Sequence, residues 1–211
     1  MTLFRLDASI NPATSSSRAI ADIVETEWQA ANPGGTIARK DLGTQPLPST
    51  AWTGAIGAAW TPEEARTEEQ RAALALAVGL ADEVRSADAV LLAVPLYNFG
   101  IPQHVKTWID LVMAGAKSAD EALLAGKPTV LVVVRGGAYG PGTPREGWDH
   151  STAYLRRILA DVWGADLTVV EREFTLVGVN PALDDFKEQA AQFKDAAHAA
   201  AAIAGKSLAS T

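Results

Sequence analysis

The segment Pro95-Leu96-Tyr97-Asn98-Phe99 has the residue types best suited to holding a ligand in this chain. It follows Ala89–Val94, an apolar run that predicts a buried strand, and precedes Ile101-Pro102, where a helix is expected to start. In an α/β protein, ligands bind at the carboxyl ends of strands. A proline fixes the backbone, an aromatic ring covers a flat surface, and an asparagine amide donates and accepts hydrogen bonds. The segment predicts contact with a planar polar ring; the alternative is a tight turn whose aromatic side chains fill the core.

A second segment, at residues 9–18, places hydroxyl side chains before an expected helix. Hydroxyls and free backbone N–H groups at a helix N-terminus form an anion site, and a phosphate monoester fits it well. The alternative is ordinary capping, which uses the same residue types. Four consecutive hydroxyl residues, 14–17, exceed what one cap needs. The candidate phosphate ligands are Ser9, Ser15, Ser16 and Ser17.

A third segment begins Val134-Arg135-Gly136-Gly137 and continues through Tyr139 to Gly140. Adjacent glycines let a backbone approach a planar ligand closely, and their N–H groups can donate to a ring that becomes electron-rich. The alternative is a flexible loop. Arg18 and Arg135 flank the candidate loops, and each is interpreted either as a neutraliser of phosphate or as a member of an ordinary ion pair.

The three segments together predict one ligand with a phosphate at one end and a flat heteroaromatic ring at the other. A mononucleotide has this form, and flavin mononucleotide (FMN) suits it best. The prediction depends on the carboxyl ends of the first, third and fourth strands lying side by side.

Strand and helix patterns alternate along the chain, and the third and fourth strands are apolar without alternation, as in a parallel sheet covered on both faces. Five β/α units predict a flavodoxin-like, doubly wound, five-stranded parallel sheet of order 2-1-3-4-5 with helices on both faces, in one domain spanning residues 1–211. The expected strands are 3–8, 36–42, 88–94, 129–134 and 167–172, and the expected helices are 17–31, 62–86, 102–114, 149–163 and 182–203.

The composition narrows the classes of partner. The net charge of −7 and the lack of a basic run argue against nucleic acid. The chain has no cysteine, and its three histidines are not at metal-ligand spacing, so no metal site is expected. No secretory leader or membrane span is expected either, which makes the cytoplasm the expected location.

With these motifs and their spacing, nearly the whole chain resembles the FMN-dependent NADH-azoreductase family, which belongs with the flavodoxin-like NAD(P)H:quinone oxidoreductases. The resemblance implies tightly bound, non-covalent FMN, with its phosphate on residues 9–18, here called the serine loop, and its ring on the segments that begin at Pro95 and Val134. It also implies NADH or NADPH as electron donor, ping-pong transfer of two electrons to quinones and azo compounds, and a homodimer. No side-chain nucleophile is expected, because the redox chemistry belongs to the flavin.

The chain departs from many members of that family at two positions. Val134 stands where many have serine, which removes a polar contact, and Tyr139 stands where many have histidine. A tyrosine hydroxyl can replace that histidine as a polar contact to the flavin, although it is a poorer proton source.

The segment 43–62, rich in proline, glycine and tryptophan, is expected to be a long loop. Trp52 and Trp60 could make it part of a roof over the partner's active site, or could simply anchor a surface loop. His104 and His150 are interpreted as helix-surface or capping residues, without a catalytic role. Two rival functions remain: a non-catalytic flavodoxin-like electron carrier or FMN-binding sensor, and an NADPH-dependent FMN reductase or chromate-type reductase.

Overall fold

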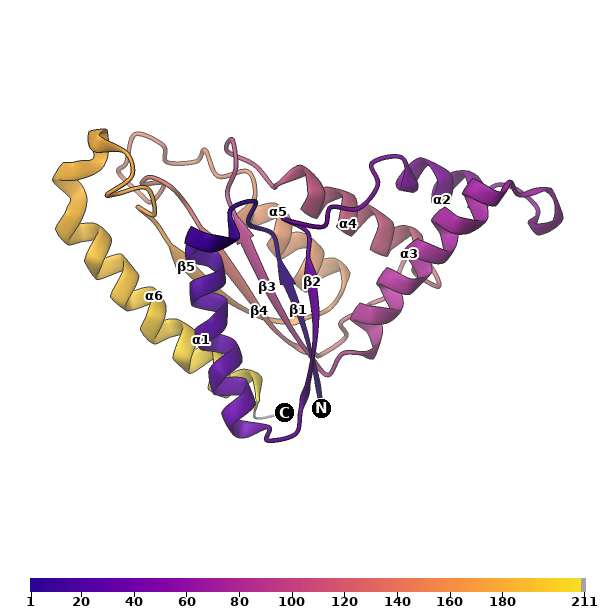
Figure 1. Cartoon of the computed structure of the whole chain (residues 1–211), viewed down its shortest axis with the longest axis horizontal. Coiled ribbons are helices and arrows are strands. Elements are labelled where there is room, and N and C mark those ends of the chain that lie inside the picture. The colour runs from indigo at the N-terminus through magenta and orange to yellow at the C-terminus, as the bar shows by residue number, and fades with distance from the viewer. Residues whose placement is uncertain (210–211) are drawn as a thin grey trace.

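The computed structural model describes residues 1–209, and its centre is a parallel sheet of five strands in the order β2-β1-β3-β4-β5 (Figure 1). The predicted flavodoxin-like order is therefore confirmed. The strands are β1 Thr2–Asp7, β2 Thr36–Asp41, β3 Ala89–Pro95, β4 Pro128–Val134 and β5 Asp166–Arg172. Each begins and ends within two residues of its predicted bounds, because these segments are short and bounded by turn residues or helix patterns, and β3 and β4 are also continuously apolar.

Helices cover both faces of the sheet (Figure 1). One layer contains α1 (Ser16–Ala31) and α6 (Lys187–Leu208), and the other contains α2 (Ala51–Ala59), α3 (Glu68–Ser86), α4 (Gln103–Ala114) and α5 (Thr152–Arg156). Side chains of β3 alternate between the two cores: Leu91 joins the α1/α6 side, whereas Leu92 joins the opposite side. Burial on both faces explains the continuous apolar sequence of this strand.

The helices α1 and α6 approach each other closely at Gly205. A Cβ atom at this position would lie 2.6 Å from the backbone oxygen of Val24 and 2.7 Å from the Cβ atom of Glu27. A larger residue is therefore excluded unless the helices separate. This contact fixes their spacing near the carboxyl-terminal end of α6.

The prediction of a loop throughout residues 43–62 is wrong, because α2 occupies Ala51–Ala59. Its alanines at positions 51, 55 and 58 are buried and let the short helix pack closely on α3. Prolines and glycines on either side masked this pattern in the sequence. Whether this segment roofs a partner's site stays a prediction.

Two predicted helix starts are also wrong. A 3-10 turn, Glu63–Ala65, follows Pro62, and α3 begins only after Thr67. Thr67 forms a capping box with Gln70: the Gln70 N–H donates to the Thr67 hydroxyl at 3.2 Å, and the Thr67 N–H donates to the Gln70 side chain at 3.0 Å. The last helix starts at Lys187 because a 3-10 segment, Pro181–Phe186, precedes it.

The predicted helix 149–163 is α5 followed by a π-helical segment, Arg157–Val162. We propose that residues 1–211 form one domain, since the same sheet carries both helical layers. Within residues 1–209, no helix is long and apolar enough to cross a membrane.

Candidate functional site

The three candidate loops meet at one edge of the sheet, because β1, β3 and β4 are neighbouring parallel strands. Hydrogen bonds join them directly. The Ile10 N–H donates to the Tyr97 hydroxyl at 3.2 Å, and the Leu96 N–H donates to the Val134 carbonyl at 2.9 Å. The structure thus brings together the serine loop, the segment 95–99 and the segment 134–137.

The serine loop caps α1 and also leaves an anion-binding feature. Ser15 is the cap, because its hydroxyl accepts from the Arg18 N–H at 3.2 Å; it also lies 3.1 Å from the Ser17 hydroxyl. Ser9 and Ser17 are buried. No acidic residue occupies the first turn of α1, so the positive end of the helix dipole is not neutralised there. Capping explains Ser15 but leaves the helix N-terminus suited to an anion.

Arg18 holds the serine loop against the sheet. Its guanidinium donates to Asp41 at 2.7 Å and to the Ser9 carbonyl at 3.3 Å, and it lies 3.9 Å from Asp7. Partial burial of Asp41 favours its protonated form, but hydrogen bonds from Arg18 and Thr44 outweigh this and lower its pKa. Of the two interpretations of Arg18, the structure shows the ion pair.

The sequence interpretation of His104 as a helix-surface or capping residue differs from what the structure shows. It is buried, and its Nε2 atom lies 2.7 Å from the Ala8 carbonyl oxygen, directly before the serine loop. Since the carbonyl can only accept, Nε2 must carry a proton and donate. His104 therefore supports the start of the loop from α4, a role that its position near a helix start gave no means of predicting.

The segment 95–99 ends in a turn of unusual conformation. The N–H and carbonyl groups of Tyr97 and Gly100 bond reciprocally at 3.2 and 2.9 Å, while Asn98 and Phe99 have positive φ angles of 48° and 67°. Two left-handed central residues define a type I′ turn, and a bulky residue in this conformation costs about 1–3 kcal/mol. Asn98 and Phe99 are exposed rather than in the core. The segment does form a tight turn, as the alternative interpretation expected, but the side chains of Asn98 and Phe99 do not fill the core and remain available to a ligand.

Phe99 is in contact with a small cluster of side chains from the loop that follows β4. Its ring lies edge-on to Trp148, with 5.4 Å between centroids, and 6.4 Å from Tyr139. The Arg145 guanidinium lies 5.8 Å from the Phe99 ring and 5.7 Å from the Tyr139 ring, within cation–π range. Sequence reasoning missed Arg145 and Trp148, because they come from a part of the loop with no recognisable motif.

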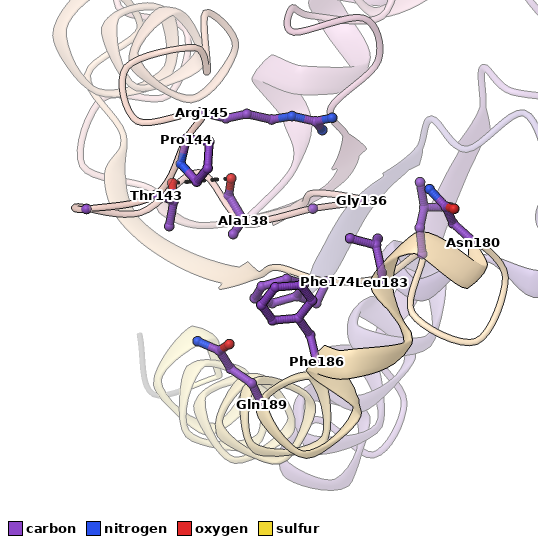
Figure 2. Close-up of a pocket in the computed structure, with 13 residues that line it drawn as sticks. Gly136, Ala138, Thr143, Pro144, Arg145, Phe174, Asn180, Leu183, Phe186 and Gln189 are labelled. Atoms are coloured by element: carbon purple, nitrogen blue, oxygen red, sulfur yellow. Dashed lines mark hydrogen bonds between the residues drawn. The ribbon is translucent and has the colours of Figure 1, made fainter.

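The two glycines have different surroundings. A Cβ atom on Gly136 would lie 2.6 Å from Leu176, so packing within the chain requires glycine there. On Gly137 it would meet only the flexible end of Arg145, at 3.3 Å. Both glycines line an apolar cavity of about 540 Å³ between this loop and the start of α6 (Figure 2). The stacked rings of Phe174 and Phe186 form its far side, whereas residues 95–99 do not line it.

Backbone donors are available in both later loops. None of the backbone hydrogen bonds found among residues 1–209 is donated by the N–H groups of Asn98, Phe99, Gly136 or Gly137. The two loops follow the neighbouring strands β3 and β4, so both present their backbone donors at the carboxyl end of the sheet. Such donors fit a planar ring with carbonyl and nitrogen acceptors, and they favour negative charge on it. The loops therefore fit the ring of FMN, and the serine loop fits its phosphate.

Arg135 faces carboxylates within the chain. Its side chain is buried and contacts Asp149 at 2.6 Å, Glu171 at 2.8 Å and the Thr152 hydroxyl at 3.0 Å. Burial opposes its charge, but hydrogen bonds with Glu171 and Asp149 outweigh burial and raise its pKa. As with Arg18, the structure shows the ion-pair interpretation.

Comparison with known proteins decides the family. The model of a family described by its flavodoxin-like fold matches residues 1–201. The chain belongs to this family. An FMN-dependent NADH:quinone oxidoreductase of Frankia casuarinae is 38% identical over 205 residues, which cover 95% of this chain and 97% of that protein. A protein of the same name from Streptomyces avermitilis is 36% identical over 211 residues, covering 99% and 97%.

Solved structures show the same fold for this flavodoxin-like family member. An azoreductase from Bacillus anthracis superposes with a TM-score of 0.76 at 21% identity, covering 98% of this chain and 99% of the other. An FMN-dependent NADH-azoreductase from the same species, solved in complex with FMN, has a TM-score of 0.68 at 18% identity, covering 95% and 99%. The match over almost the full length of both proteins confirms the architecture.

Proposed function

We propose that this chain is an FMN-dependent oxidoreductase that takes two electrons from NADH and delivers them to quinones or azo compounds. The observation that carries the proposal is the left-handed turn at Asn98 and Phe99, set between the serine loop and the glycine pair, each with free backbone donors. The names of relatives that share more than a third of the sequence over nearly the full length support this assignment.

The residues divide between the two ends of the cofactor. The phosphate is held by the N–H groups of the first turn of α1 and by the hydroxyl set Ser9, Ser15, Ser16 and Ser17. The ring lies against Pro95–Phe99 and Val134–Gly137. When bound, FMN supplies two-electron redox chemistry, with donor and acceptor using it in turn. The protein contributes binding and orientation, and its backbone donors at Asn98, Phe99, Gly136 and Gly137 favour negative charge on the ring.

This chain differs from many members of the resembled family at two positions, Tyr139 and Val134. The Tyr139 hydroxyl accepts a long hydrogen bond, 3.5 Å, from Arg145, and in the proposed site it makes a polar contact to the flavin. The Val134 carbonyl already accepts from Leu96, so Val134 contributes backbone and apolar surface only.

We also propose a homodimer. Three apolar side chains in and beside α2 are solvent-exposed in the single chain: Trp52 by 46%, Ile56 by 37% and Trp60 by 86%. A tryptophan this exposed is unusual on a monomer and typical of an interface. Sedimentation of the parent protein and of Trp60→Ser tests this, with the variant expected to shift towards monomer.

The proposed function is tested by the visible spectrum of the purified protein, recorded before and after anaerobic addition of NADH. Bound FMN, direct two-electron bleaching and reoxidation by a quinone are expected. A flavin that NADH leaves oxidised would instead favour the carrier or sensor. Faster reduction of free FMN or chromate than of quinones and azo dyes would favour the rival reductases, and comparison of NADPH with NADH identifies the donor.

Asn98→Ala is expected to weaken FMN binding by about 1–3 kcal/mol, because ring atoms would lose their partner in a desolvated site. Fluorescence titration of FMN measures this loss. Asn32→Ala is the matched control, since it removes the same side chain at the carboxyl-terminal end of α1. Equal affinities in all three proteins would remove Asn98 from the site.

A further inference from the structure

A second cavity, of about 430 Å³, lies between the start of α1 and the middle of α6. One wall is the outer side of the serine loop, including Ser15 and Ser16. The opposite wall carries basic side chains: Arg172 at the end of β5, and Lys194 and His198 on α6. Hydroxyls on one side and basic groups on the other are the chemistry of an anion site.

Arg172 is the central observation. Its Nε atom is buried without a hydrogen-bond partner, and no carboxylate of the described chain acts on its charge. Burial alone lowers its pKa, with no carboxylate to offset the loss of water. Arg172 as a whole is only partly buried, but its Nε–H is shielded from water and has no acceptor. A buried donor without an acceptor is costly, and an anion in the cavity would supply one.

His198, on α6, also has a buried nitrogen without a partner and lies near other basic groups. Its Nε2 atom is buried and has no partner among residues 1–209. Burial lowers its pKa, Lys194 and Arg172 lower it further, and only Asp195 acts in the opposite direction. Three basic side chains from two elements thus line one cavity, and Asp195 offsets only part of their effect on His198.

The other charged groups on the cavity wall are already paired. Asp22 lies 2.7 Å from Arg5, and Arg18 is bound to Asp41, also at 2.7 Å. Asp22 shares the Arg5 guanidinium with Asp7 and Glu25, so it keeps some repulsion for an anion, and Arg18 adds little attraction. Arg172 and Lys194 remain as the cations available to a ligand.

We propose that this cavity, between the serine loop and α6, binds a phosphate group through Arg172 and Lys194, with hydroxyls of Ser15 and Ser16 on the facing wall. The phosphate comes from one of two sources: the 5′-phosphate of FMN, whose proposed site shares these serines, or a separate phosphate. In the first case the proposal deepens and rests on the proposed function. In the second it is independent of it.

The test compares the parent protein with Arg172→Gln and with the control Arg71→Gln, which removes an exposed charge from α3 on the opposite face. Inorganic phosphate is titrated into the purified protein, and the His198 ring resonance is followed by NMR, with assignment from His198→Asn. A separate phosphate is expected to bind saturably, raise the pKa of His198, and bind at least tenfold more weakly to Arg172→Gln.

The second arm measures FMN and riboflavin affinities of the same three proteins. If FMN supplies the phosphate, Arg172→Gln loses at least tenfold in FMN affinity and none in riboflavin affinity, and inorganic phosphate competes with FMN. Either pattern supports the site. Unchanged phosphate and FMN binding in Arg172→Gln overturns it.

The two proposals can fail separately. A parent protein that binds no flavin but shows the phosphate effect on His198 would refute the oxidoreductase and keep the anion site. If NADH reduces the bound flavin but Arg172→Gln has no effect in either arm, the oxidoreductase is supported and the anion site is refuted.

Discussion

Charged side chains on the two faces of β5 differ in whether they have ion-pair partners. Glu171 points to the side where Arg135 lies in contact with Asp149, Glu171 and Thr152, so that each charge has a partner. The next residue, Arg172, points to the α6 side and has no partner in the described chain. Arg135, whose charge serves the fold, is buried together with its counter-charges. Arg172 is partly buried with an unpartnered Nε atom, which agrees with the proposed phosphate site.

The Arg135 cluster should show the largest effect on stability. Arg135→Gln removes the cation that contacts the largely buried carboxylates of Asp149 and Glu173, and is expected to lower the free energy of unfolding by about 3 kcal/mol. Urea unfolding measures it. Arg157→Gln, which breaks an exposed pair with Asp161, should cost less than about 0.5 kcal/mol. Similar costs for the two variants would contradict the structural importance of the paired face.

The same cluster predicts a dependence on pH. Burial raises the pKa of Asp149, but hydrogen bonds from Thr152, the Ser151 N–H and Arg135 outweigh it and lower the pKa. A carboxyl with a lowered folded-state pKa stabilises the protein above its unfolded value, about 4, and this stability is lost as the pH falls through the folded value. Asp149→Asn should therefore cost about 2 kcal/mol at pH 7 and flatten the acid limb of stability. An unchanged acid limb would show that Asp149 titrates normally.

The unpaired face should respond to a ligand rather than to the loss of a contact. In flavin-free protein, inorganic phosphate at ten times its dissociation constant is expected to raise the free energy of unfolding by about 1.4 kcal/mol. Chloride at equal ionic strength controls for screening. If Arg172→Gln gained as much from phosphate as the parent, the stabilisation would be a general ion effect.

The smallest expected effect is that of Arg172→Gln without ligand. Because the variant removes a partly buried charge whose Nε atom has no partner, its free energy of unfolding should be unchanged or higher by up to about 1 kcal/mol. Urea unfolding beside Arg135→Gln makes the comparison direct. A loss as large as that of Arg135→Gln would mean that Arg172 also serves the fold.

Most of the sheet could be predicted from the sequence, because strands buried on both faces, such as β3, are apolar throughout. The short helix α2 could not. Its buried face consists of Ala51, Ala55 and Ala58, and alanine gives little periodic contrast between buried and exposed positions. The start of α3 was misplaced because Pro62 and Thr67 both carry helix-start signals, and only the Thr67 capping box forms.

The candidate site could be predicted only as far as its loops. Residue types indicated the segments 9–17, 95–99 and 134–137, and adjacent strands do bring them together. The partners of Arg135 and the lack of one for Arg172 depend on which helix covers each face of β5. That is tertiary information, and no local pattern encodes it. The left-handed conformation of Phe99 was equally hidden, since phenylalanine rarely adopts it.

The glycine at the crossing of α1 and α6 has a consequence for how large an anion the molecule admits. With the helices in backbone contact at Gly205, they cannot slide apart there, and the gap at their other end is set by a fixed pivot. A side chain at position 205 would push the two helices apart and widen the cavity beside Arg172, although position 205 is not among the residues that line it. In the proposed anion site, such a variant is expected to admit larger anions while keeping its preference for negative charge.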